Sequence, residues 1–319
     1  MLRSTTRKLV FAMCLALSVA LMAGQALAKP GEITFASVSW TGVTIKTELA
    51  VQILDVLGYK ARNLMVSVPL AYKAMATGEA DVFLGNWMPS MATIAEKYFK
   101  DGSVIKYCEN MTGAKYTLAV PTYEYEAGLK DFSDIHRYAD KLDHRIYGIE
   151  EGNDGNEIIQ AMIDKNMFDL GDFKLVSSSE AGMLGQVQAF ARKKQWIVFL
   201  GWSPHSMNET IDMKYLTGST DATFGPNDGT ASVYTNIRKG FDKQYPNVAK
   251  FLKNLTFPIP MMNTIMTTLH NSKEEQPRRA ALKWLKANPD ILKKWLDGVT
   301  TRKGKPALPV VTAFLAKVH

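Results

Sequence analysis

Hydrophobic residues along the chain either alternate with polar ones or recur at helical spacing, and the two patterns take turns. Residues 32–40, EITFASVSW, are rich in β-forming side chains, and residues 41–57 then carry apolar side chains at helical spacing up to Gly58. Further strands are predicted in NLMVSV, ADVFLG and VIKYC, with helices after Pro69 and Pro89. Strands that alternate with helices predict a mostly parallel sheet in an α/β domain.

The same order begins again in the second half of the chain. RIYGI, FKLV and WIVFLGW predict strands, and GNDGNEIIQAMIDKNMF and SEAGMLGQVQAFARKK predict helices. Two β-rich stretches, AKYTLAVP at residues 114–121 and ASVYTNIRKG at residues 231–240, flank this half, and we expect them to cross between two lobes. The helical tail from about Tyr245 is expected to pack on the first lobe.

The predicted fold class is therefore α/β with two lobes, each a mostly parallel sheet with flanking helices, and a ligand cleft between the lobes. In such sheets, ligands bind beyond the carboxyl ends of the strands. We expect residues 29–116 to form the first part of lobe I, residues 117–228 to form lobe II, and residues 229–319 to complete lobe I.

Residues 1–28 have the composition of a secretory signal peptide. A basic start, the apolar run LVFAMCLALSVALM and the small-residue motif ALA at residues 26–28 are its three parts. We expect cleavage before Lys29 and export to the periplasm. A lipid anchor on Cys14 is the less favoured alternative, because this cysteine lies inside the apolar run. No later segment approaches about 18 unbroken apolar residues, so no membrane span is expected in the mature chain.

Charge and motif content exclude several functional classes. Three of the seven net positive charges belong to the predicted signal peptide, and the rest are dispersed, so we expect no nucleic-acid partner. Cys108 is the only cysteine after cleavage, which leaves no internal disulfide. There is no G-x-S-x-G, H-E-x-x-H, C-x-x-C or Walker A motif, and the five histidines lack metal-site spacing. We therefore expect no catalytic residue, metal or cofactor.

Three of the six tryptophans stand at the ends of predicted strands. Trp40, Trp87 and Trp202 occur in SWTG, NWMP and GWSP, and the last two each follow the tetrapeptide VFLG. The other three fit core positions in the helical tail and at the start of WIVFLGW. Core packing is an equally weighted alternative for the strand-end tryptophans. If they instead line one cleft, their faces would attract a poorly hydrated cation, above all a quaternary ammonium group.

Five segments of the chain resemble one known family. SWTGVT, ADVFLGNWMPSM, GAKYTLAVP, GIEEGNDGN and FLGWSPHSMN are similar to the choline and glycine betaine substrate-binding proteins of ABC transporters, which have the type II periplasmic binding-protein fold. The resemblance spans nearly all of the mature chain. It implies an aromatic box around the trimethylammonium group and an asparagine that hydrogen-bonds the other end of the ligand. These residues are Trp40, Trp87, Tyr116 and Trp202 for the box, and Asn153 for the hydrogen bond.

One position departs from the choline-binding members of that family, which carry an acid two residues after the first tryptophan. Here that residue is Gly42. Losing the carboxylate weakens the case for choline and removes a charge that would repel a ligand carboxylate. Gly42 and Val43 also begin a predicted helix, where free N–H groups and the helix dipole favour an anion. The alternative is that Gly42 only permits a tight turn.

Two further polar residues are close to these segments. His205, three residues after Trp202, is a candidate for contacting a ligand carboxylate, and packing beneath the box is the alternative. Asp154 is interpreted as a helix cap rather than a ligand group.

The predicted function is high-affinity periplasmic binding of a quaternary ammonium compound for delivery to an ABC permease in the inner membrane. Glycine betaine is favoured, and carnitine and choline are the alternatives. The resemblance implies a monomer that performs no chemical step. Two other classes stay open: a secreted enzyme acting on a quaternary amine, and a sensor or chaperone-like module that never meets a permease.

Overall fold

The computed structural model describes residues 31–272 and 276–318. The predicted signal peptide, residues 1–28, lies outside the described residues. Within them, nine strands form one continuous sheet in the order β2-β1-β3-β9-β4-β7-β5-β6, with β8 beside β4. The strands are β1 (Glu32–Ser37), β2 (Lys60–Met65), β3 (Val82–Met88), β4 (Val104–Pro121), β5 (Arg145–Tyr147), β6 (Lys174–Val176), β7 (Val198–Ser203), β8 (Met213–Tyr215) and β9 (Thr230–Arg238).

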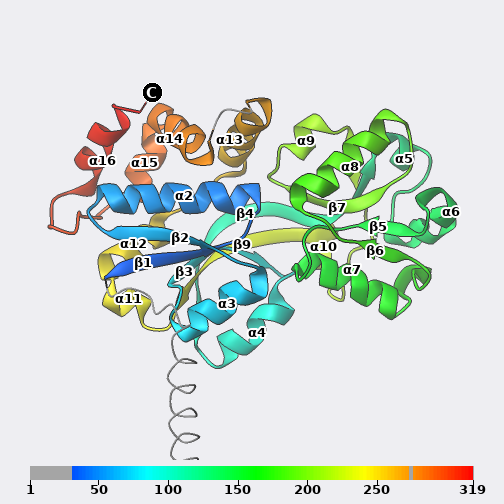
Figure 1. The fold of residues 1–319 in the computed structure, drawn as a ribbon, viewed down its shortest axis with the longest axis horizontal. Helices are drawn as coiled ribbons and strands as arrows, with labels where there is room; N and C mark the ends of the chain where they lie inside the picture. The colour runs from blue at the N-terminus through cyan, green and yellow to red at the C-terminus, as the bar shows by residue number, and fades with distance from the viewer. Residues whose placement is uncertain (1–30, 273–275, 319) are drawn as a thin grey trace, which may run out of the picture.

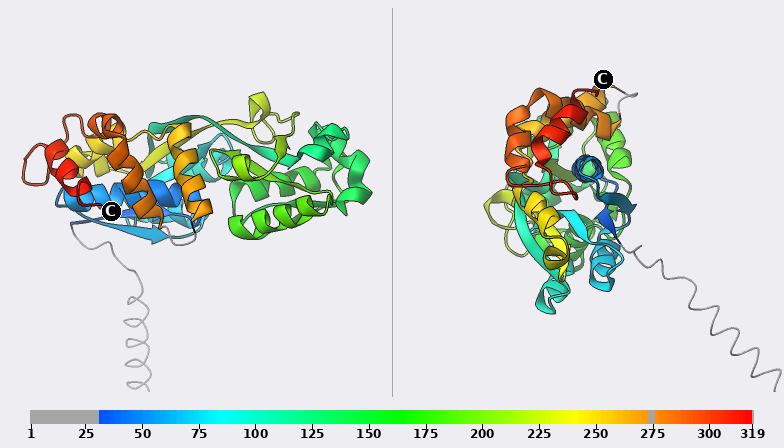
Figure 2. Two further views of the ribbon diagram at one scale, coloured as in Figure 1. Left: turned by 90° about the horizontal axis from the view of Figure 1, so that it is seen from above. Right: turned by 90° about the vertical axis from the view of Figure 1, so that its left-hand side faces the viewer.

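The sheet passes through two lobes that lie side by side (Figures 1 and 2). In lobe I, β1 pairs in parallel with β2 and β3, and in lobe II, β5 pairs in parallel with β6 and β7. Every antiparallel pair involves β4 or β9, the two strands that link the lobes. The predicted α/β fold class is confirmed. The lobe boundaries remain a prediction, and they fall within or next to these linking strands.

The linking strand β4 is longer than the sequence pattern predicts. VIKYC and AKYTLAVP, predicted as separate strands, belong to one strand from Val104 to Pro121. Three register shifts against β9 and the left-handed Gly113, at φ +70°, let the strand bend without ending. Another prediction was wrong by three residues: β2 covers Lys60–Met65 rather than residues 63–68, because α3 already begins at Val68 with Pro69 in its first turn.

Helices cover both faces of the sheet. In lobe I, α2 lies on one face, and α3 and α4 lie on the other; α7 and α8 flank the lobe II strands (Figure 1). These are α2 (Thr41–Val56), α3 (Val68–Thr77), α4 (Ala92–Lys100), α7 (Asp154–Asp164) and α8 (Glu180–Arg192). Shorter helical segments of lobe II are α5 (Thr122–Glu126), η1 (Phe132–Tyr138), α6 (Ala139–Leu142), η2 (Met167–Asp169), α9 (Met207–Thr210) and α10 (Pro226–Gly229).

The helical tail packs on lobe I, as the sequence predicts, with α14 and α16 against α2. Trp295 in this tail is fully buried and donates its indole N–H to the Thr256 carbonyl at 2.9 Å, which confirms its interpretation as a core residue. The tail consists of α11 (Phe241–Gln244), α12 (Pro246–Asn254), α13 (Ile259–Asn271), α14 (Pro277–Ala287), α15 (Pro289–Trp295) and α16 (Ala307–Leu315).

The repeated tetrapeptide VFLG forms one buried strand segment in each lobe, in β3 and in β7. Its glycine allows close packing in both. A Cβ atom on Gly85 would lie 2.8 Å from Cγ2 of Val43, and one on Gly201 would lie 2.8 Å from Cβ of Ala119. Both contacts are too short for any larger residue to fit without a shift. The tryptophan that follows each VFLG is thereby held at the end of a rigid strand.

Candidate functional site

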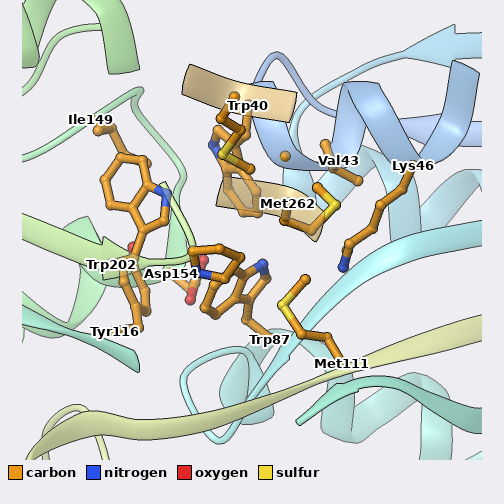
Figure 3. A pocket seen from close by; sticks show the side chains of 14 residues that line it. Trp40, Val43, Lys46, Trp87, Met111, Tyr116, Ile149, Asp154, Trp202 and Met262 are labelled. Carbon is orange, nitrogen blue, oxygen red and sulfur yellow. The ribbon is translucent and has the colours of Figure 1, made fainter. Parts of the chain in front are cut away.

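Four aromatic rings from both lobes line one cavity (Figure 3). Trp87 is in β3, Tyr116 in β4 and Trp202 in β7, and Trp40 is the N-cap residue of α2. The ring centroid of Tyr116 lies 5.9 Å from that of Trp87 and 6.3 Å from that of Trp202. Trp40, Tyr116 and Trp202 are buried, whereas Trp87 is half-buried. We call these four residues the aromatic box.

The cavity continues from the aromatic box into lobe I. It is lined by residues of both lobes, and about 520 Å³ of space, part of it open to solvent, lies among the lining atoms. Apart from Lys46 and Asp154, the remaining lining side chains are apolar or absent. The lining residues beyond the aromatic box are Gly42, Val43, Lys46, Gly85, Met111, Ile149, Asp154, Pro204, Met262 and Met266.

Asn153, predicted to hydrogen-bond the ligand, lies next to Tyr116 of the aromatic box. It is buried and is absent from the cavity lining. Its side-chain oxygen accepts a hydrogen bond from the Tyr116 hydroxyl at 3.0 Å and also caps α7 by accepting from the N–H groups of Gly155 and Asn156. In this position Asn153 fixes the Tyr116 ring at the start of a helix.

Asp154 lines the cavity, contrary to its interpretation as a helix cap. The cap is Asn153, and Asp154 is the first residue of α7. The Asp154 side chain is 2% exposed; its Oδ1 accepts from the Asn153 amide at 3.1 Å, whereas Oδ2 has no hydrogen-bond partner among the described residues. Burial raises the pKa of this carboxyl to about 7, opposed by the nearby Ser90 hydroxyl. A buried carboxyl beside aromatic faces suits a cation.

Lys46 was not singled out by the sequence analysis, although it lies on the same face of α2 as Gly42 and Val43, one turn further on. Its amine donates to Oδ1 of Asn110 at 2.9 Å and lies 5.2 Å from the centroid of the Phe257 ring. Burial lowers the pKa of Lys46 to about 7. A charged residue at an apolar helical position was the signal that could have revealed it.

Two carboxylates of lobe II hydrogen-bond the start of α2 in lobe I. The indole N–H of Trp40 donates to Oε1 of Glu150 at 2.6 Å, and the N–H of Thr41 donates to Oε2 of Glu180 at 3.2 Å. The Thr41 hydroxyl also donates to Glu180. Glu150 and Glu180 therefore hold the lobes together where α2 begins. Sequence reasoning missed both, because the contacts depend on how the lobes meet.

His205 packs against Trp202 of the aromatic box and lies outside the cavity lining. Its Nε2 is 3.1 Å from Oε1 of Glu180, its Nδ1 accepts from the N–H of Met207, and its ring lies 5.1 Å from that of Trp202. These contacts fit the alternative role of His205, packing against the box, rather than contact with a ligand carboxylate. Gly42 and Val43 do line the cavity, at the end of a helix that already interacts with the Glu180 carboxylate.

Within residues 31–272 and 276–318, no group of three or more His, Cys, Asp or Glu side chains is arranged to hold a metal ion. No helix in the same ranges has the length and apolar character needed to cross a bilayer.

The fold and the cavity define a two-lobed ligand-binding protein of the type II periplasmic binding-protein class. The chain belongs to the family described as the substrate binding domain of ABC-type glycine betaine transport systems, whose model matches residues 31–287.

Several proteins with known roles are similar to it. An ABC-transporter choline binding protein in complex with choline is 47% identical, with a TM-score of 0.86, over 89% of this chain and 98% of that chain. Lactococcal OpuAC, in a closed conformation with glycine betaine, is 26% identical, with a TM-score of 0.73, over 83% and 98%. The glycine betaine/carnitine transport binding protein GbuC of Listeria monocytogenes is 30% identical over 160 residues, which are 50% of this chain and 51% of that protein.

Proposed function

We propose that this protein is the periplasmic receptor of an ABC importer for a quaternary ammonium compound, with glycine betaine as the favoured ligand. The observation that carries the proposal is the convergence of the four rings of the aromatic box and the Asp154 carboxyl on one cavity. Ring faces attract a methylated cation, and the methyl groups gain apolar contact. The site residues we assign to the ligand cation are Trp40, Trp87, Tyr116, Trp202 and Asp154.

The energies involved are of the right size for a transport receptor. A desolvated cation–π contact contributes about 2 kcal/mol. Four such contacts would approach the roughly 8 kcal/mol of a micromolar complex, although the contributions are not additive and closure has its own cost. The hydrogen bonds of Glu150 and Glu180 to α2 support binding by hinge closure, in which the ligand stabilises the closed state.

The names of similar proteins support a ligand with three N-methyl groups. The similar proteins are named for binding choline, glycine betaine, or glycine betaine and carnitine. The resemblance implies an acid at this position in choline-binding members, whereas this chain has Gly42, so we rank glycine betaine first, carnitine second and choline third. The protein acts as a monomer that docks on its permease in the inner membrane and releases the ligand unchanged.

The proposal is tested by calorimetric titration of the purified protein with glycine betaine, carnitine, choline and trimethylamine oxide. We expect micromolar or tighter binding of glycine betaine; no heat with any of the four would refute the proposal.

A second experiment tests for turnover. Asp154 lines the cavity with a pKa of about 7, as a general base would. The mass of the ligand recovered after incubation with the protein is therefore measured by mass spectrometry. An unchanged mass is expected of a receptor, and any product would assign an enzyme instead.

A further inference from the structure

Lys46 is a buried amine in the ligand cavity that pairs with no carboxylate among the described residues. Its side chain is 3% exposed, and its one hydrogen bond goes to the neutral oxygen of Asn110. Asn110 is fixed in that orientation because its own amide donates to the Leu84 carbonyl and the Thr235 hydroxyl. An ammonium group has three donors, so two remain for another acceptor.

Burying the charged amine of Lys46 without a carboxylate partner is energetically unfavourable. Burial without an opposite charge penalises the ammonium form, which is why the pKa of Lys46 falls to about 7. Packing alone does not explain a lysine here, since the methionines that line the same part of the cavity would fill the space without that cost. Met111, Met262 and Met266 already do so around it.

The two charged groups of the cavity are on different sides of it. In Figure 3, Asp154 lies among the rings of the aromatic box, whereas Lys46 enters from α2 on the far side of Trp87, near Val43 and Met262. A ligand whose methylated nitrogen occupies the aromatic box would therefore direct its other end toward the Lys46 amine. An anionic group there would supply the acceptors that Asn110 does not.

We propose that Lys46 binds the anionic end of the ligand and thereby selects a trimethylammonium carboxylate over a simple trimethylammonium cation. This inference rests on the proposed function, which places the cation in the aromatic box. A pure cation such as choline would leave the Lys46 charge unpaired and would itself be repelled by it.

The start of α2 is a weaker anion site than Lys46. The predicted donors there, the N–H groups of Gly42 and Val43, adjoin Thr41, whose N–H and hydroxyl already donate to Glu180. The negative charge of the Glu180 carboxylate already interacts with the positive end of the helix dipole. It would also repel a ligand carboxylate bound next to it. Lys46 is one turn further along the same face and is free of this competition.

The test compares three ligands that differ only at the end away from the methylated nitrogen: tetramethylammonium, choline and glycine betaine. Each is titrated at pH 6 into the wild-type protein and into the variants Lys46→Met and Lys46→Arg. Lys106→Met is the matched control, since Lys106 is an exposed lysine outside the cavity. Thermal unfolding of each variant checks that it folds.

We expect Lys46→Met to weaken glycine betaine binding at least tenfold, while tetramethylammonium binding is unchanged or becomes tighter. Lys46→Arg should retain more glycine betaine affinity than Lys46→Met, and Lys106→Met should change nothing. An equal effect of Lys46→Met on all three ligands, or no effect, would overturn the assignment of Lys46 while wild-type binding of tetramethylammonium leaves the proposed function standing. If the wild-type protein binds none of the three, the proposed function itself fails.

Discussion

The indole N–H of Trp40 in lobe I donates a 2.6 Å hydrogen bond to Oε1 of Glu150 in lobe II. One side chain therefore serves both as a wall of the aromatic box and as a contact that holds the lobes together. Ligand binding and lobe closure are coupled at this residue, because a ligand that packs on the Trp40 ring also favours the orientation in which its N–H meets Glu150.

Replacing Glu150 by alanine should shorten the lifetime of the ligand complex. A hydrogen bond to a charged acceptor contributes about 1.5–3 kcal/mol, so dissociation of glycine betaine should accelerate about tenfold or more, with little change in association. Stopped-flow tryptophan fluorescence measures both rates. Glu151→Ala is the control, since Glu151 is exposed next to it. A slower association with an unchanged dissociation rate would contradict this role of Glu150.

Replacing Trp87 by alanine should weaken glycine betaine binding at least tenfold. Loss of one desolvated ring removes about 2 kcal/mol of cation attraction. Because Trp87 is only half-buried, the melting temperature of the empty protein should change little. Trp295→Ala should do the opposite, since Trp295 is fully buried in the helical tail, away from the cavity lining. Calorimetry and thermal unfolding measure the two effects, and reduced stability without reduced affinity in Trp87→Ala would make that ring a core residue.

The affinity for tetramethylammonium should rise between pH 5 and pH 8. Burial raises the pKa of Asp154 to about 7, with nearby Glu150 and Glu157 acting in the same direction and Ser90 in the opposite one. A bound cation favours the ionised carboxylate, so binding lowers this pKa and releases protons when the pH is below about 7. Lys46, with a pKa lowered to about 7, loses its repulsive charge over the same range.

The two contributions to this pH dependence are separated by mutation. Asp154→Asn should reduce the rise in tetramethylammonium affinity, and combining it with Lys46→Met should abolish the rise. Calorimetric titrations in buffers of different ionisation enthalpy would measure the released protons directly. A wild-type affinity that is flat from pH 5 to pH 8 would rule out titration of either group at the site.

Replacing Gly42 by aspartate should shift the preference from glycine betaine toward choline. A Cβ atom at this position would lie 2.9 Å from the terminal methyl group of Met266, a flexible side chain that can move. The added carboxylate would repel a ligand carboxylate and accept from a hydroxyl group. Gly42→Asn is the control, with similar size and no charge. Competition titrations give the affinity ratio, and an aspartate variant whose ratio matches that of the asparagine variant would refute the electrostatic explanation.

The sequence pattern predicted the rings better than it predicted the charges. Trp87 and Trp202 lie near the ends of the buried strands β3 and β7, and the apolar tetrapeptide VFLG marks both strands in the sequence. Asn153 and Asp154 are both good capping residues, and only the backbone decides that Asn153 takes the cap and leaves Asp154 to the cavity. The hydrogen bond of Glu150 to Trp40 joins residues 110 positions apart, so no local pattern could reveal it.

The central claim is that the cavity recognises a methylated nitrogen through ring faces and a buried carboxyl. Calorimetric titration with glycine betaine and with glycine, which carries the same carboxylate but no methyl groups, tests it most directly. Our account predicts micromolar or tighter binding of glycine betaine and at least hundredfold weaker binding of glycine. Equal affinity for the two ligands would contradict it.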